Sequence, residues 1–272
     1  MLVNRCSCEA CGGASLAPFR PCGDGRKLVR CQACGHVFVS EIDAAALAEA
    51  YKVDYYQSPD DPRIERWRSR NQEVWRGMVR TILKAKPDVR SLLDVGAGTG
   101  GVLREFCGLR PEVQVAAVEA SAAAREHVRR LLPAVSFPVD DAGDLDKMEL
   151  RFDVVVLAQT LEHVLNPAKL CRDVHERLTP GGVALITVPN RFSYETWLRF
   201  GADHCFGNRT HLQFFSVSSL TRMLRRGGFS DLWLAHEFGG SDRAGLMRWP
   251  QYLARLLGVS TELRLLARRT AA

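Results

Sequence analysis

The chain has 272 residues, a formal net charge of +6 at pH 7 and an apolar fraction of 46%. This length fits one large α/β domain plus a small additional module, and the apolar fraction is ordinary for a soluble protein. The longest apolar runs have the length of strands, which excludes a membrane-spanning helix, and the N-terminus lacks a signal-peptide pattern. The expected location is therefore the cytoplasm.

Residues 1–40 contain two C-x-x-C pairs, and a glycine follows the second cysteine of each pair. The four cysteines are Cys8, Cys11, Cys31 and Cys34. The total of nine cysteines is odd, which argues against a disulfide framework. Four thiolates at this spacing predict a zinc ribbon with a structural Zn²⁺, because they leave no open coordination position. Cys6 is an alternative to Cys8 at a less suitable spacing.

Residues 41–87 are expected to form a helical linker or lid, with a long helix from about Pro62 to Lys86. Tyr55 and Tyr56 lie in a break before this helix. They are candidates for contact with a substrate, although aromatic packing is an equal alternative. The arginines between Arg63 and Arg80 are candidates for phosphate contacts, against the simpler interpretation of a solvated helix face.

Residues 88–236 alternate predicted strands and helices, and this pattern predicts a doubly wound α/β sheet. The predicted strands are 91–95, 113–118, 135–139, 152–158, 184–188 and 232–235. The predicted helices are 102–108, 122–131, one within 161–178, and 217–226. Residues 237–272 mix leucines and arginines, so we expect a C-terminal helical segment that packs on the domain, with dimerisation or membrane contact as alternatives.

A glycine-rich turn follows the first of these strands. Gly96, Gly98 and Gly100 provide the conformational freedom and the space that a ligand needs beside the backbone. Gly101 completes a G-x-G-x-x-G pattern, so the glycines alone leave a nicotinamide dinucleotide open. Asp94 inside the strand favours a cationic ligand instead, either an amine or a sulfonium.

Two further acids follow the next predicted strands. The carboxyl ends of parallel strands meet at the edge of the sheet where ligands bind. Glu119 follows the second strand and is expected to accept hydrogen bonds from both ribose hydroxyls of a nucleoside. Asp141 follows the third predicted strand and is expected to meet the amino group of an adenine.

These features belong to an ordered set of motifs. The set comprises Leu92–Gly100, Val118-Glu119, Asp141-Ala142, Phe152-Asp153 with Leu161–Val164, Leu178–Gly182, and His211–Ser216 with Gly228-Phe229. In this order the motifs resemble those of class I S-adenosylmethionine-dependent methyltransferases. They are similar to the branch that includes ubiquinone-pathway O-methyltransferases and many natural-product and sugar methyltransferases. The cysteine-rich start resembles the zinc ribbon of bacterial sugar C-methyltransferases.

The resemblance implies a Rossmann-like sheet of seven strands, two of them supplied by residues 228–272, and S-adenosylmethionine as the cofactor. It also implies a role for each matching residue. The backbone of Gly96–Gly100 would line the methionine part, with Asp94 supporting it, and Glu119 would hold the ribose. Asp141 and Ala142 would flank the adenine, and Gln159 would face the sulfonium.

Two histidines are candidates for the general base that removes the acceptor's proton. His163 lies after the fourth strand, and His211 lies in the aromatic insertion that follows. A structural hydrogen-bonded role is the alternative for both. Some relatives bind a divalent metal through E-x-x-E-H and a distant histidine. Here Gln159 stands in place of the first glutamate of Gln159-x-x-Glu162-His163, which weakens such a site.

Residues 190–215 are rich in aromatic side chains and are expected to form the acceptor pocket, with Trp197 and Phe214 as contacts. The function predicted first is methyl transfer to a small molecule: a sugar, a lipid or a secondary metabolite. The alternatives are an RNA methyltransferase, which the sparsely basic ribbon disfavours, and a cofactor-binding scaffold without an acceptor site. The sequence leaves open whether oxygen, nitrogen or carbon accepts the methyl group, and the oligomeric state.

Overall fold

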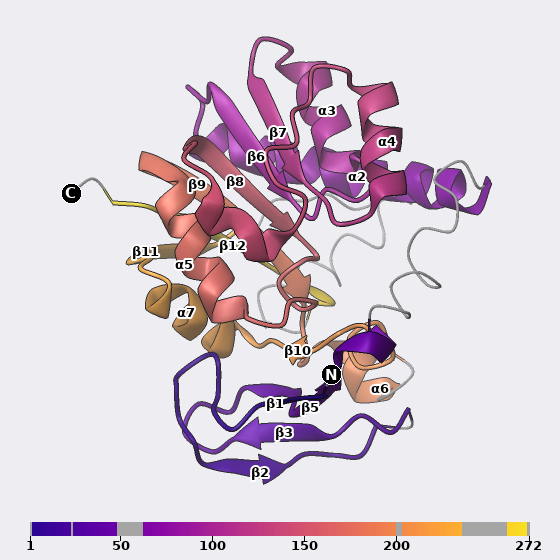
Figure 1. Ribbon diagram of the computed structural model, residues 1–272, viewed down its shortest axis with the longest axis vertical. Coiled ribbons are helices and arrows are strands. Elements are labelled where there is room, and N and C mark those ends of the chain that lie inside the picture. The colour runs from indigo at the N-terminus through magenta and orange to yellow at the C-terminus, as the bar shows by residue number, and fades with distance from the viewer. Residues whose placement is uncertain (1, 23, 48–61, 200–202, 236–259, 271–272) are drawn as a thin grey trace.

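The computed structural model describes residues 2–22, 24–47, 62–199, 203–235 and 260–270. Its centre is a six-stranded sheet in the order β11-β12-β9-β8-β6-β7 (Figure 1). The strands are β6 (Ser91–Val95), β7 (Gln114–Val118), β8 (Phe152–Ala158), β9 (Leu178–Pro189), β11 (Asp231–Leu234) and β12 (Glu262–Arg268). The pairs β6–β7, β6–β8 and β8–β9 are parallel, whereas β12 runs antiparallel to both β9 and β11.

Helices cover both faces of this sheet, as the doubly wound prediction requires. One apolar core lies beneath α2 (Pro62–Ala85), α3 (Gly101–Leu109) and α4 (Ala122–Leu131). The other lies beneath α5 (Pro167–Arg177), α7 (Val217–Arg226) and the 3-10 turn η1 (Ala142–Lys147). The parallel strands are apolar toward both faces, which is what burial on both sides demands.

Three predictions differ in the structure. Residues 41–43, at the start of the expected helical linker, form strand β5 (Glu41–Asp43), which pairs with β1 (Leu2–Asn4). Residues 135–139 form no strand, and only Ser136 makes an isolated bridge, to Ala116 of β7. Pro133 and Pro138 flank this bridge, and a proline cannot donate a hydrogen bond to a neighbouring strand.

The C-terminal segment was predicted to be helical, but residues 262–268 form strand β12. Leucine and arginine favour helices in isolation, yet pairing with β9 and β11 overrides that preference. Leu263 and Leu265 enter one core while Leu266 enters the other, which is the alternation of a strand between two layers. Together β11 and β12 supply the two late strands that the family resemblance implied.

The N-terminal region forms a second, smaller sheet in the order β10-β4-β3-β2. Its strands are β2 (Leu16–Pro18), β3 (Leu28–Cys31), β4 (Val37–Val39) and β10 (Gln213–Phe214). The short pair β1 (Leu2–Asn4) and β5 (Glu41–Asp43) lies beside it. Because β10 belongs to the insertion after β9, the ribbon and the insertion share one sheet.

The ribbon also shares side-chain packing with the main domain. Cys8, Ala10 and Phe38 belong to the same buried cluster as Phe215 and Leu220. The guanidinium group of Arg226, at the end of α7, donates a 2.9 Å hydrogen bond to the Glu9 carbonyl oxygen. The ribbon is therefore packed against the α7 side of the sheet. Among the described helices, none combines the length and the apolar character needed to cross a bilayer.

Candidate functional site

The four predicted cysteines meet at one point of the ribbon. Their sulfur atoms all lie within 4.8 Å of one another, and the distances Cys8 Sγ–Cys34 Sγ and Cys11 Sγ–Cys31 Sγ are 3.5 Å. A tetrahedral ion with bonds of about 2.3 Å to sulfur would separate its ligands by about 3.8 Å, so this spacing suits zinc. Cys6 is exposed and lies outside the cluster, so Cys8 and not Cys6 completes the set of four sulfurs.

The glycine turn has the backbone that its sequence predicts. Gly96, Gly98 and Gly100 have φ values of 77°, 54° and 75°, in the left-handed region that favours glycine. At Gly96 a Cβ atom would lie 2.4 Å from the Thr160 hydroxyl oxygen, so no larger residue fits there. Helix α3 begins directly after the turn, with Gly100 at its N-cap position. Its first amide groups therefore border the same crevice.

Two buried carboxyl groups lie beside this turn. Glu119 accepts hydrogen bonds of 2.8 Å from the amides of Gly98 and Ser121. Asp94 is 2% exposed, and its Oδ1 has no hydrogen-bond partner among the described residues. Burial, reinforced by the charge of Glu119, raises the pKa of Asp94 to about 7. The end of β6 thus holds buried negative charge that a cationic ligand would compensate.

Of the remaining predicted cofactor residues, Gln159 directly follows strand β8, whereas Asp141 and Ala142 lie at the start of the 3-10 turn η1. Gln159 has a φ of 57° directly after β8, and its Nε2 donates a 2.9 Å hydrogen bond to Oε2 of Glu262. Asp141 caps η1 and accepts a 2.7 Å hydrogen bond from the Gly143 amide, with Ala142 as the first residue of that turn. The contact with Glu262 was not predicted, because residues 262–268 were not expected to form a strand.

The loop after β8 brings Glu162, His163 and His211 together. Oε1 of Glu162 lies 3.8 Å from Nε2 of His163 and 4.0 Å from Nε2 of His211. The loop holds the insertion in place, because the Glu162 carbonyl oxygen accepts hydrogen bonds from the amides of Leu212 and Gln213. Both carboxyl oxygens of Glu162 are buried without a hydrogen-bond partner among the described residues.

Backbone contacts determine which nitrogen of each histidine carries the proton. Nδ1 of His163 lies 3.2 Å from the Thr210 carbonyl oxygen, and Nδ1 of His211 lies 2.8 Å from that of Cys205. A carbonyl oxygen only accepts, so we assign the proton to Nδ1 and the lone pair to Nε2 in both rings. Burial lowers the pKa of His163 to about 4 and that of His211 well below its usual value. Burial raises the pKa of Glu162 to about 8.

The predicted substrate contacts have different environments. Trp197 is 84% exposed on the short helix α6 (Tyr194–Leu198). Phe214 is 0% exposed and stacks on Phe206 with ring centroids 4.3 Å apart, so its ring packs the core beneath the insertion and is closed to an acceptor. Tyr55 and Tyr56 lie outside the described residues.

Arg26 connects the ribbon to the loop that carries His211, and no sequence motif marks it. Its Nη1 donates hydrogen bonds to the carbonyl oxygens of Asn208 and His211, at 2.9 Å and 2.8 Å. Its Nη2 donates to the Phe206 carbonyl oxygen, and its Nε pairs with Asp24 at 2.6 Å. One ribbon side chain therefore holds three backbone groups of the insertion.

Replacing Arg26 by glutamine should lower the free energy of unfolding by about 2 to 4 kcal/mol, because several charge-assisted hydrogen bonds are lost and carbonyl groups remain unpaired. Urea unfolding would measure this change. Lys27→Gln is the matched control: the Lys27 side chain is 67% exposed and its ion-pair partner among the described residues is the surface residue Glu41, so its loss should cost less than about 1 kcal/mol. Equal effects of the two substitutions would contradict the role of Arg26.

Comparison with known proteins places this geometry in a family. The chain matches the methyltransferase domain family over residues 67–233. A ubiquinone biosynthesis O-methyltransferase of Coxiella burnetii is 28% identical over 149 residues, which are 51% of this chain and 63% of that protein. A dTDP-4-amino-2,3,4,6-tetradeoxy-D-glucose N,N-dimethyltransferase of Saccharopolyspora spinosa is 36% identical over 138 residues, 49% of this chain and 52% of that one. Both matches therefore span less than two thirds of the curated relative.

Solved structures share the fold at low sequence identity. An O-methyltransferase family protein from Burkholderia thailandensis superposes with a TM-score of 0.57 at 16% identity, covering 84% of this chain and 68% of that one. The plantazolicin methyltransferase BamL superposes with a TM-score of 0.59 at 16% identity, covering 82% and 95%. The family match covers more than half of the sequence and contains the glycine turn, Asp94, Glu119 and the Glu162-His163 loop. The chain belongs to the methyltransferase domain family.

Proposed function

We propose that this protein transfers a methyl group from S-adenosylmethionine to a small-molecule acceptor. The observation that carries the proposal is the pair of buried carboxyl groups, Asp94 and Glu119, beside the left-handed glycine turn. The cofactor combines a sulfonium, an ammonium and a ribose. Buried negative charge suits the cations, and a carboxylate can accept both ribose hydroxyls.

Within this proposal the protein mainly aligns donor and acceptor, because the sulfonium is already a good leaving group. His163 and His211 are the proposed bases. Each is assigned a lone pair on Nε2 because its Nδ1 faces a backbone carbonyl oxygen. Burial lowers the pKa of both rings, so they are neutral at pH 7, but the same shift weakens them as bases, and the position of Nε2 rather than the pKa supports this role.

The same cluster has the donor set of a divalent-metal site, and this role is an alternative to the first, because an Nε2 lone pair that binds a metal can no longer accept a proton. Glu162 contributes two buried oxygens without a described partner, and both assigned Nε2 lone pairs lie within 4.0 Å of one of them. A bound cation would be held by Glu162, His163 and His211 and would supply Lewis-acid activation of an acceptor hydroxyl. The ribbon cysteines would hold a separate, structural zinc, since four thiolates close its coordination shell.

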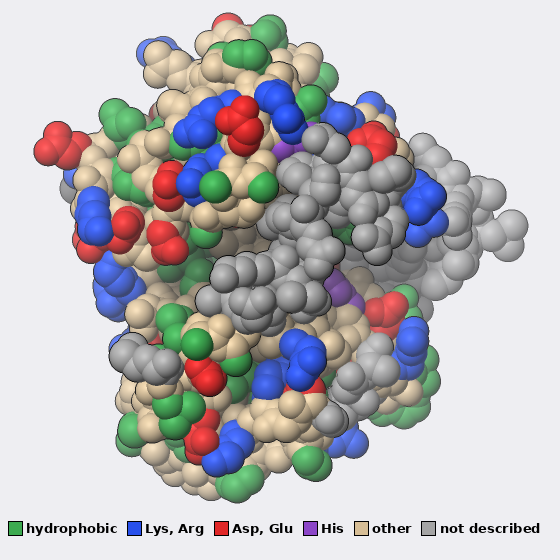
Figure 2. All heavy atoms as spheres, turned by 45° about the vertical axis from the view of Figure 1, so that its right-hand side comes forward, with side chains coloured by type: hydrophobic (Ala, Val, Ile, Leu, Met, Phe, Trp, Pro, Cys, Tyr) green, Lys and Arg blue, Asp and Glu red, His purple; other side chains and the backbone are tan. Residues whose placement is uncertain are grey.

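Two observations favour a small-molecule acceptor. The relatives named above act, by their names, on a ubiquinone precursor and on a nucleotide-linked amino sugar. Arginines of α2, which an RNA-binding face would need, instead pair with glutamates: Arg68 with Glu65, and Arg76 with Glu73 and Glu105. Figure 2 shows acids interspersed among the basic side chains on one face of the molecule.

Calorimetric titration with S-adenosylmethionine and with S-adenosylhomocysteine tests the proposal directly. Binding of both, followed by formation of S-adenosylhomocysteine when a true acceptor is added, is the expected result. Absence of heat with either compound would overturn the proposed function.

The affinity for S-adenosylmethionine should rise with pH. The pKa of Asp94 is about 7, so a cationic ligand binds the ionised form and must displace a proton at lower pH. About a tenfold rise is expected between pH 6 and pH 8, because the ionised fraction of the free protein rises by that factor. Titrations at pH 6.5 in buffers of different ionisation enthalpy would measure the released proton.

Asp94→Asn should flatten this pH dependence, whereas Asp88→Asn, a substitution of an exposed aspartate, should preserve it. In the absence of ligand, the folding stability should depend on pH in the opposite direction: it should fall as the pH rises. The pKa of Asp94 is raised on folding, so its stabilising contribution is complete below pH 3.8 and is lost as the pH rises through about 7. An affinity that is independent of pH in the unaltered protein would contradict the assignment.

A further inference from the structure

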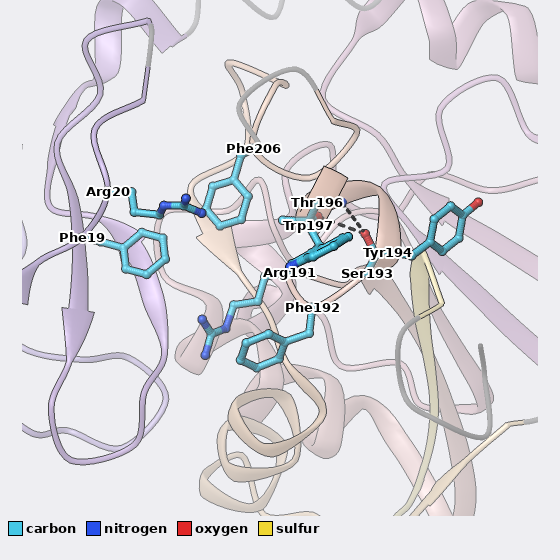
Figure 3. A pocket seen from close by; sticks show the side chains of 9 residues that line it. All are labelled: Phe19, Arg20, Arg191, Phe192, Ser193, Tyr194, Thr196, Trp197 and Phe206. Atoms are coloured by element: carbon cyan, nitrogen blue, oxygen red, sulfur yellow. Dashed lines mark hydrogen bonds between the residues drawn. The ribbon is translucent and has the colours of Figure 1, made fainter. Parts of the chain in front are cut away.

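A cavity of about 460 Å³ lies between the ribbon and the insertion (Figure 3). Phe19 and Arg20 line it from the ribbon, following β2. The segment that follows β9 supplies Arg191, Phe192 and Trp197, and Phe206 forms a further part of the wall. The volume lies within the range of about 300 to 1,000 Å³ that is typical of small-molecule sites.

Several aromatic side chains line this cavity, and some of them are strongly exposed. Trp197 is 84% exposed and Phe192 is 57% exposed, although both belong to residue types that normally bury their rings. Phe19 and Phe206 lie in a stacked arrangement with centroids 6.0 Å apart. A concentration of exposed rings at one cavity indicates a surface that binds a ligand with flat, apolar faces.

The cavity also carries concentrated positive charge. Nη2 of Arg191 donates a 3.0 Å hydrogen bond to the Gly35 carbonyl oxygen, and a Cβ on Gly35 would lie 3.8 Å from that nitrogen and 3.9 Å from Nη2 of Arg30. The two guanidinium groups are therefore neighbours. Burial, together with the charge of Arg30, lowers the pKa of Arg191 to about 10. Arg20 and Arg191 line the cavity, and Arg30, which lies outside its lining, adds its charge beside Arg191, so an anion in the cavity would offset the repulsion between these cations.

The cavity is connected to the proposed reaction centre through a short piece of backbone. Phe206 directly follows Cys205, whose carbonyl oxygen accepts the hydrogen bond from Nδ1 of His211. Strand β9 ends at Pro189, and Arg191 therefore lies at the start of the insertion. A ligand in the cavity would thus contact the same turn that orients His211.

We infer that this cavity binds a planar ring that carries an anionic group, either a phosphate or a carboxylate, as the non-reacting end of the acceptor. The rings of Trp197 and Phe19 would contact its flat faces, and Arg20 and Arg191 would bind its charge. The ribbon then contributes directly to acceptor recognition. Naming the ligand an acceptor rests on the proposed methyl transfer, whereas the existence of the binding site does not.

Two probes distinguish the sources of the anionic group: thymidine 5′-diphosphate and 4-hydroxybenzoate, each titrated calorimetrically into the full-length protein. Binding of either probe is expected, and the probe that binds identifies the anion as a phosphate or a carboxylate. Trp197→Ala and Arg20→Gln should each weaken that binding about tenfold, and both should leave the affinity for S-adenosylmethionine unchanged. Arg191→Lys tests the third contact while keeping a cation in place.

Matched surface substitutions on α3 provide the controls. Leu109→Ala removes an apolar side chain that is 56% exposed, and Arg104→Gln removes an exposed guanidinium group; neither should alter probe binding. Failure of both probes to bind, or binding by the Trp197 and Arg20 variants that is as tight as that of the unaltered protein, would overturn this inference. If the unaltered protein binds a probe but does not bind S-adenosylmethionine, the proposed function is overturned and the inferred anion site is still supported.

Discussion

Replacing Cys31 and Cys34 together by serine is expected to remove one zinc ion per chain and to unfold the N-terminal ribbon. Both sulfurs belong to the four-cysteine cluster, and two thiolates cannot hold a structural zinc. Apparent binding energies of such ions are about 10 to 16 kcal/mol in small zinc-dependent peptides. The ribbon here also packs on the main domain, so we expect a loss of at least about 5 kcal/mol in the free energy of unfolding.

Metal analysis and chemical unfolding would measure the two effects separately. Cys6→Ser is the matched control, because Cys6 is an exposed ribbon cysteine outside the cluster, and its zinc content and stability should stay unchanged. Metal that remains after the double substitution would point to the Glu162, His163 and His211 cluster. Unchanged zinc content in the double variant would contradict the assignment of the ribbon ligands.

Glu119→Ala should weaken S-adenosylmethionine binding by more than about a hundredfold. Hydrogen bonds that involve a charged group contribute about 1.5 to 3 kcal/mol each, and a ribose offers two hydroxyls to this carboxylate. The substitution also removes the acceptor for the Gly98 and Ser121 amides, which loosens the glycine turn. Calorimetry gives the affinity, and circular dichroism would verify that the variant folds.

Two further substitutions separate these contributions. Gly98 and Ser121 donate to different oxygens of Glu119, so Glu119→Gln keeps an acceptor for one of the two amides and loses the charge. Its affinity should therefore fall between those of the unaltered protein and the alanine variant. Glu126→Ala replaces an exposed glutamate on α4, the helix that follows Glu119, and should bind normally. Normal binding by Glu119→Ala would refute the proposed ribose contact.

Local sequence signals predicted the central sheet because they agree with the tertiary contacts there. Leu92 packs in one core and Leu93 and Val95 in the other, with the buried Asp94 between them, and the glycines after this run have the positive φ values that their spacing suggested. Strand β12 could not be predicted in this way. Its leucines and arginine suit a helix locally, and only the partners β9 and β11, distant in sequence, make it a strand.

Some residues of the candidate site could likewise be predicted from local sequence signals, and others could not. Asp94, Glu119 and His163 directly end or follow strands, so the topology of the fold predicts their convergence. Arg26 and Arg191 hold backbone groups through long side chains, and neither residue belongs to a recognisable motif. Phe214 illustrates the converse: its aromatic insertion suggested an acceptor contact, yet pairing of β10 with β4 buries its ring.

That pairing bears on how the chain folds and on how it can be divided. Strand β4 leaves the ribosome early, but its neighbour β10 follows only after most of the central sheet has been made. Until then β4 presents an open edge, which is a known starting point for aggregation and strand exchange. A gene fragment that ends before residue 213 should therefore yield a ribbon with an unpaired edge. Grafting the ribbon onto another methyltransferase would require transferring β10 with it.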